Sequence, residues 1–597
     1  MRTRPTLLAL VALTVLAVCA IPTFAQDSSH FPPNTGIYQG VDGPLSPMTR
    51  FLASDRGKEY MLHSPNPAMR GLLHWFHPEA VSEYPKEPLR QAPAGPAAHV
   101  AFHPAVTTTG CGTTTGTVMN LEPAANAVGQ YAPGVDFILS ELGSGKDLVA
   151  EYGQDNRVDF IFDSMAAIYV HRDGTQTCYG GTDFEMSNPP ITDPNDHTQM
   201  MMGTTGQMIA DPNPSHKQFI FADTRQDTLT SGVGLRRVAA SSMESTSTCP
   251  AGTQNTTQSA TCAGTNGIIV FASEDNLSDS VAIAQDPRTS GTGAGDIYVV
   301  SPSVRELRTV ILLSACKATF ASISDCSSPM ILSGSTSGGL PSVTVVGGGP
   351  NAGAIGISYA TAEPDTLHFL SCTPNGAPNP PTCTSSHTVT SDDAIYANLT
   401  NNPLPEIDPW PQLVARTDSA GQTFFLVWSD CKAGDFTEGL YGCPESQIVM
   451  ATNTSLTSPA WTLHHIYGTG EDRFAPSVAY DAGQGIVTVA YYATVSDAYK
   501  NRTRMAINQV PAASTTPGST VVLNSTYDSL QGDGTGYYFL DLQAVENASV
   551  AAHGGTSSGS SRVYVGFTSN ARQGMYTGTG GTFTNTQADN AILRATY

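Results

Sequence analysis

The stretch SVAYDAGQGIVTVAYYATVSD, from Ser477 to Asp497, joins two apolar runs through a Gly-rich turn. Apolar runs rich in Val and Tyr on both sides of such a turn predict a β-hairpin. The same pattern returns about every 60 to 75 residues. Clear copies lie at 207–225, 280–303, 341–361 and 411–430, and weaker copies begin at Val135 and Leu540. A repeat of this period predicts stacked or radial β units.

About seven copies over the last three quarters of the chain predict an all-β fold. We expect a β-propeller of four-stranded antiparallel blades, with seven blades favoured and six as the alternative. The expected organisation is a signal peptide at 1–25, an irregular Pro-rich N-terminal arm at 26–121 and the propeller at 122–597. Residues 116–123 of the arm are a candidate strand, because a strand near one terminus commonly completes the blade built by the other.

The first residues have the features of an export signal. Arg2 and Arg4, an apolar run from Leu7 to Ile21 and small residues before Gln26 predict a secretory signal peptide. A lipid anchor at Cys19 is disfavoured because the residue before it is not small. The formal net charge of −23 disfavours nucleic acid and anionic membrane surfaces as partners. No later apolar stretch is long enough for a membrane helix, so we expect a secreted, extracellular protein.

Cysteines outside the leader are even in number, because ten of the 11 follow Cys19. An even number in an exported chain predicts disulfides, although ten cysteines allow on the order of a thousand pairings. Zinc ligation is disfavoured because the chain lacks closely spaced C-x2-C pairs. Spacing favours four pairs that each bracket a polar loop and one longer pair: Cys249–Cys262, Cys316–Cys326, Cys372–Cys383, Cys431–Cys443 and Cys111–Cys178.

Three segments, at 120–138, 279–300 and 472–497, resemble repeats of the secreted bacterial sialidase-like (BNR, or Asp-box) β-propeller superfamily. The resemblance spans roughly Asn120 to the C-terminus and implies the propeller fold. The Asp box, S-x-D-x-G-x-T-W, is present only as VHRDGTQTC at 170–178, with an echo at 458–462. We expect disulfide-necked loops, notably those of Cys316–Cys326 and Cys372–Cys383, to replace this structural turn in some blades. The R-I-P signature that carries the first arginine of sialidases is missing, so the resemblance does not imply their mechanism.

Candidate ligand-binding residues follow from the repeat. In a propeller, residues before the first strand of a blade and after its second strand surround the channel mouth. These positions hold Arg157, Asp223, Arg225, Asp279, Asp408, Asp430, Asp472, Arg473, Asp541 and Arg572. Nearby aromatic residues that would stack on sugars are Trp410, Trp428, Tyr491, Tyr492, Tyr537 and Tyr538, although strand alternation places about half of them in the core.

The same carboxylates have a structural interpretation. An Asp at the start of a strand often accepts backbone N–H groups, and Asp-x-Arg often forms an ion pair that ties neighbouring blades. If they serve a ligand, several inward carboxylates would hold Ca²⁺, and arginines would bind a carboxylate. No other cofactor is expected, and the six histidines of the arm form no H-E-x-x-H pattern that would indicate a metal site.

Two functions remain open. The first is a non-catalytic binding module for an extracellular glycan or protein. The alternative is a glycan-active hydrolase or lyase whose acid and base come from Asp279, Asp408, Asp472 and Asp541. Carboxylates paired with arginine or with backbone would favour the binding module. A purely structural matrix protein is a third possibility. The chain has no phosphate-loop or haem motif.

Overall fold

The computed structural model describes Lys58 and the part of the chain given in the following ranges. These are residues 118–120, 130–138, 147–155, 165–172, 178–185, 191–192, 199–213, 215–226, 231–239, 267–273, 281–305, 308–332, 334–335, 338–362, 365–391, 411–416, 422–431, 446–466, 468, 470–494, 502–523, 528–529, 549–553, 562–578 and 581–596. The predicted signal peptide and nearly all of the predicted arm lie outside them, so secretion and the domain boundaries stay predictions.

The described strands form seven antiparallel sheets. The first sheet holds β2 (Gln130–Ile138), β3 (Asp147–Asp155), β4 (Met165–Arg172) and β5 (Cys178–Glu185). The second holds β6 (Ile191–Thr192), β7 (Gln199–Ala210), β8 (Gln218–Gln226), β9 (Ser231–Ala239) and β10 (Ile268–Ser273). The third holds β11 (Ala282–Gln285), β12 (Ile297–Arg305), β13 (Arg308–Cys316) and β14 (Met330–Ile331), with the short helix η3 (Ile323–Asp325) in its last loop.

The remaining sheets continue in chain order. The fourth holds β15 (Gly338–Val345), β16 (Ile355–Ala362), β17 (Asp365–Thr373), β18 (Thr382–Cys383) and β19 (His387–Ser391). The fifth holds β20 (Gln412–Ala415), β21 (Phe424–Cys431), β22 (Ser446–Asn453) and β23 (Thr462–Ile466). The sixth holds β24 (Arg473–Asp481), β25 (Ile486–Thr494), β26 (Arg502–Pro511), β27 (Thr520–Val522) and β28 (Asp528–Ser529). The seventh holds β29 (Ser549–His553), β30 (Arg562–Gly578), β31 (Gly581–Thr596) and β1 (Val118–Asn120).

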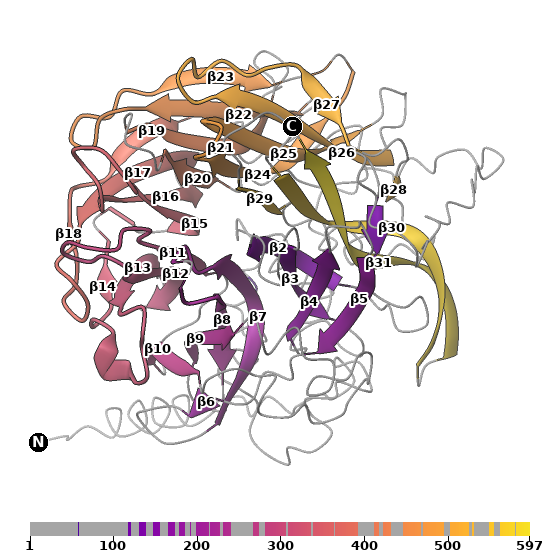
Figure 1. Ribbon diagram of the computed structural model, residues 1–597, viewed down its shortest axis with the longest axis horizontal. Helices are drawn as coiled ribbons and strands as arrows, with labels where there is room; N and C mark the ends of the chain where they lie inside the picture. The colour runs from indigo at the N-terminus through magenta and orange to yellow at the C-terminus, as the bar shows by residue number, and fades with distance from the viewer. Residues whose placement is uncertain are drawn as a thin grey trace, which may run out of the picture.

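The sheets stand around a common centre, as Figure 1 shows. The inner strands β2, β7, β11, β15, β20, β24 and β29 contact one another in that order, and β2 also contacts β29. Strand β1 pairs with β31, so a strand from the N-terminal part completes the sheet built by the C-terminus. The all-β propeller class is therefore confirmed, and the candidate strand at 116–123 is found as β1 within it.

Each inner strand is the edge of its sheet, so the backbone N–H groups that point away from the sheet need acceptors elsewhere. In this ring a polar side chain on one inner strand accepts such a bond from the next inner strand. These bonds run from Ile283 N to Gln207 Oε1 (2.6 Å), Leu413 N to Ser342 Oγ (3.0 Å), Ala415 N to Thr344 Oγ1 (3.0 Å) and Val550 N to Ser477 Oγ (3.2 Å). The isolated polar residues of the apolar repeats thus join neighbouring sheets.

The core lies between the sheets. Strand β25, IVTVAYYAT, is buried along nearly its whole length because both of its faces pack against other sheets. One face contributes Val487, Val489 and Tyr491 to a cluster shared with β21 and β22. On the other face the Tyr492 ring stacks on Phe474, with 5.7 Å between ring centroids. Double burial explains why these strands are almost continuously apolar instead of alternating.

Two predicted disulfides are present, Cys316–Cys326 and Cys372–Cys383. Each closes the loop between the third and fourth strands of its sheet, which is where an Asp box would lie. The incomplete Asp box at 170–178 likewise connects β4 to β5, and its central residues lie outside the described residues. For the other three predicted pairs, at least one partner lies outside the described part of the chain, so those pairs stay predictions.

Candidate functional site

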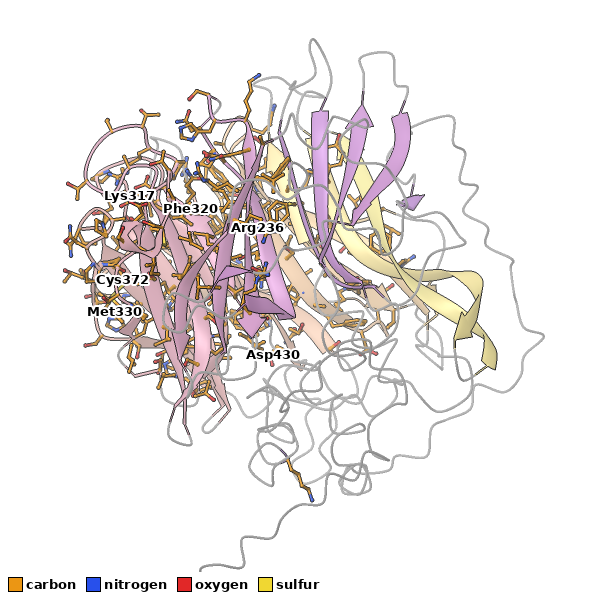
Figure 2. The ribbon with its side chains drawn as sticks, turned by 90° about the horizontal axis from the view of Figure 1, so that it is seen from below. Arg236, Lys317, Phe320, Met330, Cys372 and Asp430 are labelled. Atoms are coloured by element: carbon orange, nitrogen blue, oxygen red, sulfur yellow. A yellow bond between two sulfur atoms is a disulfide. The ribbon has the colours of Figure 1, made fainter. Side chains whose placement is uncertain are left out.

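Predicted site residues with described side chains lie at one end of their sheets. In an antiparallel sheet the start of the first strand and the end of the second meet at the same end. Asp223 and Arg225 stand near the end of β8, Asp430 near the end of β21, and Arg473 begins β24. Figure 2 places Asp430 near one end of the sheets and Phe320 and Lys317 near the other. We call the Asp430 end the mouth end.

Asp223 and Arg225 form a buried ion pair. Arg225 Nη2 lies 2.6 Å from Asp223 Oδ2, and both side chains are at most 1% exposed. Arg236 lies beside them on β9 and is also buried. Burial, and next the positive charge of Arg225, lower the pKa of Arg236 to about 10, while Asp223 opposes this shift. The predicted Asp-x-Arg motif therefore forms an internal ion pair, in line with its structural interpretation.

Asp472 connects two sheets. Its Oδ1 accepts a 2.9 Å hydrogen bond from the backbone N–H of Ser446, the first residue of β22. Its own backbone N–H donates to Thr494 Oγ1 at 2.8 Å. The residue is 1% exposed. The Asp472 carboxylate thus binds the backbone of the preceding sheet, as expected for an Asp at the start of a strand.

Arg473 is held by a polar network inside the sixth sheet. Its Nη1 donates to Tyr491 Oη and to Thr520 Oγ1, each at 3.1 Å. Its Nη2 lies 3.3 Å from Glu471 Oε2, and Arg504 Nη2 lies 3.1 Å from the other oxygen of the same carboxylate. Burial is the main cause that raises the pKa of the Tyr491 hydroxyl. Glu471 therefore joins two arginines, and sequence reasoning missed both Glu471 and Arg504.

Three aromatic residues proposed for sugar stacking are core residues. Trp428, Tyr491 and Tyr492 are each at most 1% exposed. Trp428 packs in the cluster between the fourth and fifth sheets. Trp410, Tyr537 and Tyr538 lie outside the described residues. The structure thus assigns half of the proposed aromatic set to packing, as strand alternation implies.

The remaining candidates are only partly described. Arg157, Asp279, Asp408 and Asp541 lie outside the described residues, so their role stays a prediction. Arg572 lies in β30, where it pairs with Gln587 after a register shift. Asp430 is buried at 7% exposure, across from Gln447 of β22. The described candidates are spread over four sheets, with the Asp223 pair on the second sheet and the others on the fifth, sixth and seventh.

Among the described residues, no group of three or more His, Cys, Asp or Glu side chains is arranged to hold a metal ion. The proposal of Ca²⁺ at the mouth, which includes carboxylates outside those residues, stays untested. The described part of the chain also contains no helix long and apolar enough to span a membrane.

No protein-family model and no curated protein matches the chain. An N-acetylgalactosamine deacetylase from F. plautii, solved with blood group B trisaccharide, is 9% identical over 82% of this chain and 96% of its own, with a TM-score of 0.28. An exo-β-1,3-galactanase from Phanerochaete chrysosporium, solved with galactose, is 11% identical over 80% of this chain and 100% of its own, with a TM-score of 0.28.

A third solved structure has a different activity in its name. Prolyl oligopeptidase B from Galerina marginata is 9% identical over 75% of this chain and 48% of its own, with a TM-score of 0.35. Scores this low carry no argument about ligand or reaction. The sialidase-like resemblance therefore stays a prediction, and the functional proposal depends on the residues themselves.

Proposed function

We propose that the protein is a secreted β-propeller that binds an extracellular glycan or protein at the mouth end without catalysing its turnover. The observation that carries this proposal is that Asp472 is buried and binds a backbone N–H group. A general acid or base must reach the reacting group of a substrate. Asp472 is nearly inaccessible, and its Oδ1 accepts the Ser446 N–H. It is the one member of the predicted acid–base set with a described side chain.

The Asp223–Arg225 pair supports the same proposal. An arginine that binds a ligand carboxylate must present its donors to solvent. Arg225 instead points at an internal carboxylate and is fully buried. The ligand contacts would therefore come from mouth-end candidates that lie outside the described residues, Asp279, Asp408 and Asp541 together with Arg157.

The test is a glycan array and a sugar-release assay on the mature protein, with and without EDTA. We expect binding without release of sugar. Asp279→Ala, Asp408→Ala and Asp541→Ala are the test variants, and at least one should weaken binding. Asp325→Ala is the matched control, because it removes a carboxylate from a loop at the opposite end. Release of sugar from any array member would overturn the proposal in favour of the hydrolase or lyase.

A further inference from the structure

Three loops at the end opposite the mouth share one arrangement. They connect the third and fourth strands of three consecutive sheets and comprise residues 317–325, 374–381 and 454–461. Each loop contacts the sheet that precedes its own in the ring. We call them the first, second and third clasp. Two have a disulfide at the neck, and the third has none.

The first clasp inserts Phe320 against the second sheet. Phe320 is 1% exposed and belongs to a cluster with Val233 and Leu235 of β9. Arg237 of β9 covers its ring, with 4.9 Å from Cζ to the ring centroid, and donates from Nη2 to the Phe320 carbonyl at 2.9 Å. Burial is the main cause that lowers the pKa of Arg237. Figure 2 shows Phe320 and Lys317 of this clasp at the end away from Asp430.

The second clasp covers the β11–β12 turn of the third sheet. The backbone N–H of Ala377 donates to Asp296 Oδ2 at 2.7 Å. Pro374 lies so close to Gly293 that a Cβ there would stand 2.6 Å from it. Inside the loop, Asn375 Nδ2 donates to the Pro380 carbonyl at 2.7 Å. The loop is thus shaped by its own hydrogen bonds and contacts the preceding sheet through Pro374 and Ala377.

The third clasp reaches the fourth sheet without a disulfide. Its Leu456 carbonyl accepts from Ser371 Oγ at 3.1 Å, and Trp461 meets Phe369 edge-on at 5.2 Å. Its neck is held by Asn453, whose Oδ1 accepts from Ser455 N at 3.0 Å and from Ala460 N at 3.3 Å. In the third clasp the Asn453 side-chain amide thus joins the two ends of the loop, as a disulfide does in the first two clasps.

Contacts of a loop with a neighbouring sheet must offset the conformational entropy that the loop loses on ordering. A covalent neck lowers that entropy cost because it removes open conformations of the loop. We propose that Cys316–Cys326 and Cys372–Cys383 hold the first two clasps closed between sheets, and that a dithiol reductant releases them. In that step the dithiol gives two electrons and two protons to the disulfide, which becomes two thiols, while the dithiol becomes a disulfide.

Release has a directional consequence. Opening the first clasp withdraws Phe320 from the second sheet, and opening the second withdraws Ala377 from the Asp296 carboxylate. Each disulfide therefore protects the sheet before its own. This device lies at the end opposite the mouth, and it does not rest on the proposed ligand function.

Hydrogen exchange of the full mature protein tests the proposal. In Cys316→Ala/Cys326→Ala we expect exchange across β9 to rise by at least about tenfold, with no change at 454–461. In Cys372→Ala/Cys383→Ala the rise should fall on residues 286–296, with β26 unchanged. Exchange that stays at the wild-type rate in the preceding sheet would overturn the proposal. An equal rise at the control segments would also overturn it, because the disulfides would then stabilise the whole fold.

Two further measurements test the proposal if a double cysteine variant does not fold. Phe320→Ala keeps the disulfide and should raise hydrogen exchange across β9 as the double cysteine variant does. Exchange of β9 at the wild-type rate would contradict the proposal that the first clasp protects the second sheet. Wild-type protein treated with dithiothreitol should show the same local rise once mass analysis confirms the free thiols. An absent rise with reduced cysteines would overturn the role of the disulfide.

Discussion

The Ser446 backbone N–H donates a 2.9 Å hydrogen bond to Oδ1 of Asp472, across the boundary between the fifth and sixth sheets. Ser446 begins β22 of the fifth sheet, Asp472 directly precedes β24 of the sixth, and both residues are buried. A carboxylate that satisfies a buried N–H is a structural group, since its removal leaves the donor without an acceptor.

Asp472→Ala should lower the free energy of unfolding by about 1–3 kcal/mol, because the Ser446 N–H loses its acceptor. Asp472→Asn keeps an oxygen at the same place and should cost less. Urea unfolding of the three proteins measures both effects. Equal stability of wild type and Asp472→Ala would contradict the structural role.

Breaking the Asp223–Arg225 pair should be more costly. Asp223→Ala removes the carboxylate that Arg225 contacts and that lies beside Arg236, and should cost about 3–5 kcal/mol. Arg225→Ala should cost less, because Arg236 still lies beside Asp223. The double variant should cost less than the sum of the two, since it removes both members of the ion pair together. A double-mutant cycle in urea gives the coupling energy. Additive losses would show that the two residues act independently.

Much of the fold was predictable because its signal is local. The hairpin of β24 and β25 lies within one continuous stretch, so its apolar runs and Gly turn identify it. The closing strand β1 was predictable from topology, because a propeller needs a partner for its last sheet. The loop disulfides were predictable from spacing, since each pair closes one short loop.

The site was less predictable because its contacts are not local. Asp472 stands at the position that the repeat indicates, yet its partner Ser446 precedes it by 26 residues and lies in another sheet. Glu471 and Arg504 meet only because β24 and β26 flank β25, a register that the sequence does not state. The charged GEDR run at 470–473, unusual in a chain with 13% charged residues, was the available signal for this network.

A glycine pair tests close packing between the third and fourth sheets. Gly353 and Gly485 both occupy inner hairpin turns with positive φ, +90° and +64°. A Cβ at Gly353 would overlap the Arg288 guanidinium, which binds Asp286, whereas a Cβ at Gly485 would meet nothing within 4 Å. Gly485→Ala should cost only the backbone strain of about 1–2 kcal/mol, and Gly353→Ala should add the cost of moving the end of the Arg288 side chain away from Asp286. Thermal or urea unfolding of both variants compares them, and equal losses would exclude the steric contact.

The second clasp should respond to pH through Asp296. Burial, the largest cause, raises the pKa of this carboxyl above its ordinary value of 3.8. The folded protein then binds the proton more tightly, so the group's contribution to stability is full below 3.8 and is lost as pH rises through the folded pKa. Compared with Asp296→Asn, wild type should gain stability as pH falls from neutral toward 4. A difference between the two proteins that does not change with pH would contradict this.

The first clasp should respond in the opposite direction through Asp325. The hydrogen bond from Lys317, followed by the Ala321 N–H, lowers the pKa of this carboxyl to about 2. Its contribution to stability is present above 3.8 and is lost as pH falls toward 2, because the proton then binds the unfolded chain more tightly. The stability difference between wild type and Asp325→Asn should therefore shrink between pH 5 and 2. Urea unfolding of the two proteins at several pH values measures this difference. A difference that stays constant from pH 5 to 2 would contradict the role of Asp325.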